Sequence, residues 1–407
     1  MSRKLFLVIA GLALLALALA ACAGPQGQPG PAGPQGPAGP AGPAGPAGES
    51  ASPAAVSAGA EYVGAATCGA CHDKIYGTFM KSGHPYKLNP VVDGKAPQYP
   101  FTQVPEPPEG YTWDDISYVI GGYGWKARFV NKNGYIITDA PGKSGNENYT
   151  GQWNFANAVH NKPAGWVKWN AGKPDVPYNC GSCHTTGYSP RGNQDDMPGM
   201  VGTWAEAGVQ CEACHGPGSL HANNPSGVTM TIDRDPELCG ACHTRGDFRV
   251  IHSVNGFMEH REQNLSLFQS KHYPLGCVTC HDPHAGVVQL RQAGEQTAKT
   301  KCESCHFMET QFQKPHVGNL DCVTCHMPRI ARTAVGNAAI YTGDMRAHLF
   351  GINPYQFEQF TEDGKASLPY VGLNFACKQC HVEGGSASVK DDQVLINFAA
   401  GFHNRDK

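Results

Sequence analysis

The sequence predicts a mainly α-helical fold with much irregular loop, in which short helices surround bound groups instead of a large side-chain core. Three observations support this prediction. The pattern C-x-x-C-H occurs eight times in 407 residues. From Cys180 onward the motifs recur at short intervals, with Gly, Pro and Asn between them and few long amphipathic runs, so only short helices fit. Large apolar residues are sparse along the chain, so the bound groups must supply much of the apolar surface.

The C-x-x-C-H pattern is the attachment motif of a c-type haem. Its two thiols lie on one side of a helical turn, where each can bind a haem vinyl group, and its histidine faces the iron. With 17 Cys and 18 His in 407 residues, chance predicts only about 0.03 occurrences. We therefore predict eight covalently attached c-type haems. The predicted attachment residues are Cys68, Cys71, Cys180, Cys183, Cys211, Cys214, Cys239, Cys242, Cys277, Cys280, Cys302, Cys305, Cys322, Cys325, Cys377 and Cys380.

Two alternatives are zinc sites built from paired C-x-x-C motifs and a disulfide scaffold. Neither needs a histidine directly after every second cysteine. The motifs also use sixteen of the seventeen cysteines, which leaves only Cys22. Haem attachment therefore explains the pattern better than either alternative.

Each iron is expected to take its first axial ligand from its own motif. Ten histidines remain, so a second imidazole is available for every iron, with two histidines to spare. A histidine just before a motif cannot easily pass around its own porphyrin, so His272 and His316 are expected to bind neighbouring haems. Two imidazoles per iron predict low reduction potentials relative to haems with Met and His. The motif ligands are His72, His184, His215, His243, His281, His306, His326 and His381; the distal candidates are His84, His160, His221, His252, His272, His284, His316 and His348, with His260 and His403 competing for the same role.

Residues 1–21 are predicted to be a signal peptide, because a short basic start precedes the uncharged apolar run Leu5–Ala21. The residues Leu19-Ala20-Ala21-Cys22 resemble the lipobox of bacterial lipoproteins, so Cys22 is predicted to carry a lipid. Ordinary cleavage after Ala20 is the alternative. We expect an exported lipoprotein at the outer membrane or cell surface.

Residues 22–60 are predicted to connect the lipid to a haem domain that spans residues 61–407. From Gly24 to Gly48 every third residue is glycine, with Pro, Ala and Gln between, which is a collagen-like repeat. A single polyproline-II stalk of roughly 80 Å fits this segment. A triple helix, which would make a homotrimer, also fits, but so few triplets form only a weak triple helix, so we favour the stalk.

The interval between His72 and Cys180 is long and contains no haem motif. Alternating segments around residues 126–130 and 135–138 flank Asn133-Gly134, which predicts a small β-hairpin within residues 111–139. A docking surface or substrate pocket is one role for this hairpin. A structural insert packed over the first haems is the role we favour.

Three segments resemble a known family: GVQCEACHGPGSLH at Gly208–His221, CVTCHDPH at Cys277–His284 and CVTCHMPR at Cys322–Arg329. They are similar to multihaem cytochromes related to hydroxylamine oxidoreductase and its tetrahaem electron-acceptor cytochrome. The resemblance implies that His221 is a distal ligand and that the haems form parallel and perpendicular pairs. The chain departs from this family in having no C-x-x-C-K motif and a shorter head than the octahaem enzymes.

Three functions are compatible with these features. The first, which we favour, is electron transfer along a wire of bis-histidine haems, from a membrane or periplasmic donor to an extracellular cytochrome or a mineral acceptor. The second is an oxidoreductase of small nitrogen or sulfur compounds in which one iron keeps an open position. The third is a subunit of an extracellular cytochrome filament built by head-to-tail stacking. The formal charge of −3, made more negative by haem propionates, argues against nucleic acid as a partner.

Overall fold

The computed structural model describes residues 59–311 and 320–403. The predicted signal peptide, Cys22, the collagen-like segment and His316 lie outside the described residues. Within the described ranges, no helix has the length and apolar character needed to span a bilayer.

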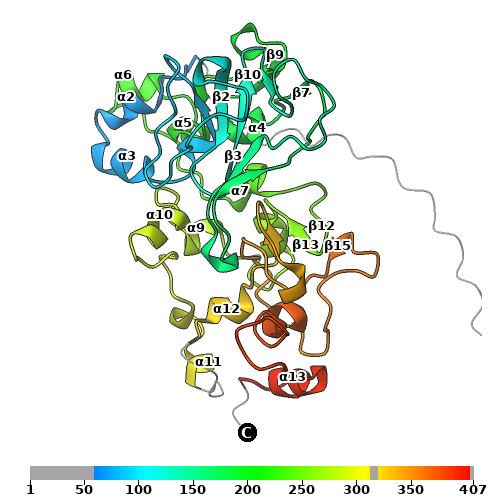
Figure 1. The fold of residues 1–407 in the computed structure, drawn as a ribbon. Coiled ribbons are helices and arrows are strands. Elements are labelled where there is room, and N and C mark those ends of the chain that lie inside the picture. Colours follow the sequence, from blue (N-terminus) through cyan, green and yellow to red (C-terminus); the bar gives the residue numbers. More distant parts are fainter. Residues whose placement is uncertain (1–58, 312–319, 404–407) are drawn as a thin grey trace, which may run out of the picture. The chain divides into compact units, whose positions relative to one another are not determined.

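The long interval without a haem motif folds into a sheet of seven antiparallel strands (Figure 1). The predicted hairpin is confirmed: β3 pairs with β4 across Asn133-Gly134, where Gly134 has a φ of 85° and its N–H donates to Asn131 O at 3.0 Å. The sheet extends well beyond residues 111–139, because later segments add strands at its edges. Its strands are β1 (Leu88–Pro90), β2 (Ile116–Gly121), β3 (Lys126–Asn131), β4 (Tyr135–Ile136), β5 (Gln152–Asn154), β6 (Gly165–Val167) and β7 (Val176–Pro177).

The central strands of this sheet bury side chains on both faces. Val119 and Phe129 face one core, and Tyr118 and Val130 face the other, as the alternation of side chains along a strand requires. The second core also contains Tyr178, which lies just before the second haem motif. One face of the sheet is therefore placed against a predicted haem site.

A second sheet of four strands follows the fourth motif, and two further strand pairs lie between the second and third motifs. Ile251, Phe257 and Met258 of this sheet pack with Leu265 and Ile330 into a third core. The expectation of a mainly α-helical fold is therefore wrong. The fold is mixed, because enough β-branched and aromatic residues lie between motifs to build sheets. The strands are β8 (Thr185–Thr186), β9 (Ser189–Asn193), β10 (Val201–Thr203), β11 (Glu206–Ala207), β12 (Ile251–Val254), β13 (Phe257–Glu259), β14 (Ala331–Arg332) and β15 (Ala366–Ser367).

The described helices are short, as predicted, and six of the twelve contain residues of a haem motif. In several motifs the histidine N–H donates to the carbonyl of the first cysteine, at 2.9 Å from His72 to Cys68 and 3.0 Å from His281 to Cys277. Both thiols of a motif therefore lie on one helical turn. The helices are α2 (Ala65–Gly69), α3 (Asp73–Phe79), α4 (Gly181–His184), α5 (Cys211–His215), α6 (Ser219–Asn223), α7 (Pro236–His243), α8 (Gln263–Phe268), α9 (Cys277–Cys280), α10 (Val287–Gln292), α11 (Phe307–Gln311), α12 (Cys322–His326) and α13 (Asp392–Ala399).

Shorter turns complete the structure. The last motif begins in a π-helical turn, η7, and the other six are 3₁₀ turns. These are η1 (Pro85–Lys87), η2 (Trp113–Asp115), η3 (Ala158–His160), η4 (Gln194–Asp196), η5 (Cys302–Ser304), η6 (Ala338–Ile340) and η7 (Asn374–Lys378).

A continuous cavity of about 4100 Å³ runs among the motif helices. Residues of the second to eighth motifs line it, and the sixteen motif cysteines form no disulfides. The predicted haems would fill this space and supply apolar surface between the motifs.

Chain produced without haem attachment is expected to lack a cooperative fold, because nothing would fill this cavity. Far-UV circular dichroism and an ¹H–¹⁵N spectrum of the haem-free chain, compared with the haem-loaded protein, test this. A sharp melting transition and a well-dispersed spectrum of the haem-free chain would contradict it.

Candidate functional site

The motif histidines are held in the tautomer that a metal ligand needs. Their Nδ1 atoms face carbonyl oxygens, at 2.8 Å from His215 to Thr231 O, 2.7 Å from His326 to Phe350 O and 2.8 Å from His381 to Ser388 O. Because a carbonyl only accepts, Nδ1 carries the proton and Nε2 keeps its lone pair. Such outer hydrogen bonds orient the ring and keep its other nitrogen available for a metal.

Within the part of the chain that the structure describes, six motif histidines have a second imidazole facing them. Two nitrogens each about 2 Å from one iron place their ring centroids roughly 6 Å apart. The observed separations are 5.7 to 6.4 Å, so each pair fits an iron between its rings. The pairs are His72–His221, His243–His84, His215–His284, His306–His272, His281–His348 and His326–His403.

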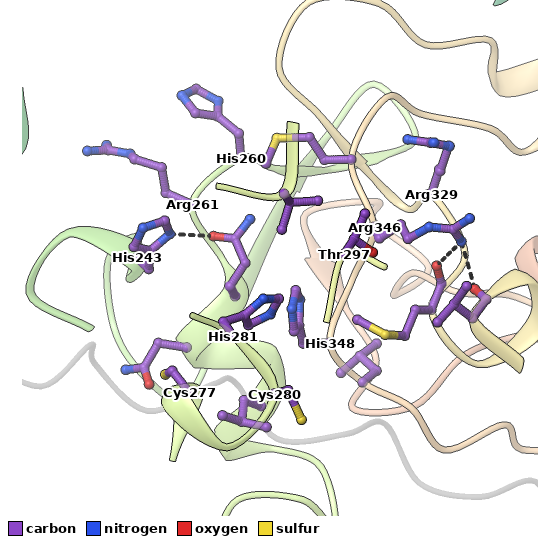
Figure 2. Close-up of a pocket in the computed structure, with 18 of the residues that line it drawn as sticks. His243, His260, Arg261, Cys277, Cys280, His281, Thr297, Arg329, Arg346 and His348 are labelled. Carbon is purple, nitrogen blue, oxygen red and sulfur yellow. Dashed lines mark hydrogen bonds between the residues drawn. The ribbon is translucent and has the colours of Figure 1, made fainter. Parts of the chain in front are cut away.

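These pairs join segments that lie far apart in the sequence. His284 follows the fifth motif but faces His215 of the third, and His272 precedes the fifth motif but faces His306 of the sixth. Figure 2 shows another pair, His281 and His348, with their rings side by side. The arrangement matches the expectation that a flanking histidine serves a neighbouring haem.

The structure changes the set of distal histidines. His403 faces His326, whereas His160 Nε2 lies 2.9 Å from Gly343 O and faces no motif histidine. His252 is exposed on β12, and no described ring faces it. Sequence proximity to a motif favoured His252 over His403, because the chain's return path across the cavity is not visible in the sequence.

Neighbouring motifs lie close together, as their thiols and helices show. The thiols of Cys183 and Cys242 are close enough to interact directly, and Cys183 Sγ lies 3.9 Å from Ala241 O. The helices α2 and α5, α4 and α7, α7 and α9, and α12 and η7 are in contact. Further thiol proximities are Cys68–Cys211, Cys214–Cys239, Cys239–Cys277, Cys280–Cys305, Cys302–Cys322 and Cys325–Cys380.

These contacts define an order for the motifs in space. The first, third, fourth, fifth, sixth, seventh and eighth motifs follow one another as neighbours. The second motif adjoins this line at the fourth. Bound haems would therefore form a line with a side branch at the fourth motif.

The second motif differs from the six paired ones. His184 donates from Nδ1 to Lys87 O at 3.1 Å, which leaves Nε2 free to bind iron. Among residues 59–311 and 320–403, however, no second histidine ring faces His184. An iron held by His184 would have no described imidazole on its other side.

Basic side chains line the cavity around the second motif. Lys126 and Arg128 alternate along β3 on the sheet face that turns toward Tyr178. His260 and Arg261 follow β13, and Figure 2 shows them near His243, away from Arg329 and Arg346. We name Lys126, Arg128, His260 and Arg261 the basic cluster; all four line the cavity.

The basic cluster is held in place before any ligand binds. Lys126 Nζ donates to Thr333 O, and Arg128 stacks on Trp169 at 3.7 Å while its Nε donates to Gln152 Oε1 at 2.7 Å. Arg261 has a φ of 75°, unusual for a residue with a side chain, and its buried Nε has no partner among the described residues. An unpaired buried donor in this setting fits an anionic ligand.

Burial and mutual repulsion shift the pKa values of this cluster. Desolvation, with the charge of Arg128 next, lowers the pKa of Lys126 to about 7. Desolvation likewise lowers the pKa of Arg128 to about 10 and that of His260 to about 3, with Lys126 adding to the effect on His260. An anion bound among these groups would stabilise their charged forms.

Glu212, inside the third motif, organises the ligands of the first. Its buried carboxylate accepts hydrogen bonds from the N–H groups of Val63, Gly64 and Gly218, at 2.7 to 3.1 Å. Gly64 begins α2, which leads to His72, and Gly218 begins α6, which contains His221. One carboxylate therefore holds both segments that carry the facing pair His72–His221.

Sequence reasoning missed Glu212, Lys87 and three members of the basic cluster, and it considered His260 only as a distal ligand. Glu212 follows a motif cysteine, and its role depends on backbone amides more than a hundred residues away. The alternation of Lys126 and Arg128 in an otherwise apolar strand was the one available signal, because a strand buried on both faces rarely carries two cations.

These features define a multihaem c-type cytochrome, and comparisons with known proteins agree. Residues 150–216 match the family model described as cytochrome c554 and c-prime. The resemblance to hydroxylamine oxidoreductase and the number of haems stay predictions.

The chain is related to named multihaem proteins. It is 22% identical over 370 residues to the dissimilatory sulfite reductase MccA of Wolinella succinogenes, covering 66% of this chain and 51% of that protein. It is 28% identical over 141 residues to the multiheme cytochrome MtrA of Shewanella baltica, covering 31% of this chain and 38% of that protein. The fold is similar to that of W. succinogenes octaheme sulfite reductase MccA, with a TM-score of 0.55 and 17% identity over 85% of this chain and 72% of the other. The chain thus spans about half the length of the curated relatives it matches.

Replacing His403 by Ala is expected to leave the iron at His326 with one imidazole. Electron paramagnetic resonance of the oxidised protein should then show an additional high-spin ferric signal. H160A and H252A serve as controls and should leave the spectrum unchanged. An additional high-spin signal in either control, with none in H403A, would contradict the pairing.

Replacing Glu212 by Gln is expected to destabilise the haem-loaded protein by about 2–4 kcal/mol, because the backbone donors lose a charged acceptor. It should also change the spectrum of the haem at His72. Thermal unfolding and resonance spectra measure the two effects. E206Q is the matched control, since Glu206 accepts a hydrogen bond from the backbone of Ala65 alone; equal effects of the two substitutions would count against this role of Glu212.

Proposed function

We propose that this chain is a multihaem oxidoreductase that reduces a small sulfur or nitrogen oxyanion at its second haem site, fed with electrons by the other haems. One observation carries this proposal: among the described residues no imidazole faces His184, whereas one faces each of six other motif histidines. Haem iron with one axial protein ligand supplies an open coordination position and electrons. The proposal ranks the oxidoreductase alternative above the wire without a reaction site that the sequence alone favoured.

The basic cluster supports an anionic substrate. Arg128 is fixed through Trp169 and Gln152, which leaves its terminal nitrogens to bind oxyanion oxygens as a fork. Lys126 adds a second positive charge from the same strand, and its lowered pKa suits it to donate a proton near neutral pH. Preorganised cations in a partly desolvated cavity bind anions more strongly than the same groups in water. The relative MccA is a dissimilatory sulfite reductase, which supports this substrate class.

A relay function is the second candidate, and the order of the motifs favours it. The line from the first to the eighth motif does not pass through the second. Cys71 and His72 of the first motif and Cys302 and Cys305 of the sixth are exposed. Electrons could therefore pass along this line, without using the second haem, and be exchanged with a redox partner at the surface.

We propose further that the haem domain works outside the cytoplasmic membrane. Predicted export, the lipid at Cys22 and the stalk to residue 60 would tether it to the outer membrane or cell surface. A membrane or periplasmic donor would then reduce it, and an extracellular cytochrome or a mineral would be an alternative acceptor.

The open position predicts a high-spin ferric signal in the oxidised wild-type protein, which cyanide converts to low spin. K126M is expected to weaken sulfite or nitrite binding by about 10- to 100-fold at unchanged haem content, because a charged hydrogen bond is lost. Titration of the high-spin signal with each anion measures this. K132M, at an exposed lysine directly after β3, should bind like wild type.

An entirely low-spin wild-type protein that does not bind cyanide would overturn the oxidoreductase proposal and leave the relay. Equal weakening by K126M and K132M would mean that general charge, and not the basic cluster, attracts the anion.

A further inference from the structure

Lys87 is a cation that the proposed reaction does not use. It ends the short turn η1 and lines the cavity, on the side of His184 where that ring's Nδ1 meets the Lys87 carbonyl. Its charge lowers the pKa of three histidines, His84, His184 and His243. Two of these form the facing pair of the fourth motif, and the third belongs to the second motif. Lys87 therefore lies between the second and fourth motifs, where the side branch joins the line of motifs.

No acidic side chain among the described residues forms an ion pair with Lys87. Burial lowers its pKa, and no acidic group offsets this effect. A lysine kept in a cavity wall without a counter-charge is costly. Bound haems would bring propionate groups into this cavity. A propionate is an anion that could form an ion pair with the Lys87 ammonium group.

Two of the other histidine pairs have a negatively charged side chain near an outer ring nitrogen. Asp282 Oδ1 lies 3.6 Å from Nδ1 of His284, and Glu309 Oε2 lies 3.8 Å from Nδ1 of His306. At the fourth motif, by contrast, His243 Nδ1 meets the neutral amide oxygen of Gln263 at 3.1 Å. Negative charge near a ligand disfavours the reduced haem and positive charge favours it, because reduction removes one positive charge from the iron.

We propose that Lys87 pairs with a haem propionate where the second and fourth haems meet, and that its charge makes the fourth haem the bis-histidine site of highest potential. This inference rests on the haem positions of the proposed function. Electrons arriving along the line from either side would then collect at the fourth haem, directly beside the second. Lys87 would thus influence which haem holds the electron, without contacting the substrate.

The test is a spectroelectrochemical titration of the full-length, haem-loaded protein, followed at its low-spin bands, with variants K87M, K87Q and K87R. In K87M and K87Q the highest-potential low-spin component is expected to shift to lower potential, while the other components stay in place. K87R keeps the charge and should stay close to wild type. K81M, at an exposed lysine earlier in the same segment, is the matched control and should show no shift.

An unmoved highest-potential component in K87M and K87Q, or an equal shift in K87R, would overturn the inference. Should removal of the charge impair haem incorporation, loss of one haem in K87M and K87Q but not in K87R would support the ion pair, and equal loss in all three would refute it. The readout is a low-spin haem potential, whereas the open position is detected by a high-spin signal, so either proposal can fail while the other holds.

Discussion

The structure depends on imidazoles that face one another from segments far apart in the sequence. Each facing pair, such as His215 with His284, can bind one iron and so tie two parts of the chain together. These bonds replace the contacts that a side-chain core would make, since the motif helices are short and surround open space. Folding, cofactor attachment and the order of the electron path are consequently set by the same residues.

Local patterns predicted local structure well. The cysteine spacing predicted the helical turns, and Asn133-Gly134 predicted the turn between β3 and β4, because both depend on neighbouring residues. The extent of the sheets was missed, since β5 to β7 and β12 to β15 are two- to four-residue strands whose pairing is set by tertiary contacts. The same limit applies to the site: a histidine at position 403 faces the seventh motif only because the chain returns to the cavity at its end.

Charged side chains are distributed unevenly among the motifs. Some of them hold the backbone in place, and others can stabilise a bound anion or a reduced haem. A buried carboxylate, Glu212, anchors backbone amides around the first motif and touches no iron ligand directly. One group of cations lies where the second motif meets the fourth, with the basic cluster lining the cavity and the Lys87 carbonyl next to His184, and a second group, Arg291, Arg329 and Arg346, lines another part of the cavity. A site that binds an anion and receives electrons benefits from the first group, because positive charge stabilises the bound anion and the reduced haem alike.

The most direct test is an experimental structure of the haem-loaded protein at a resolution that shows every axial ligand. We predict a haem at each of the eight motifs, two histidines on the irons at the six facing pairs, and His184 as the single protein ligand of the second iron. A second protein ligand on that iron, from His260 or any other residue, would contradict the central claim.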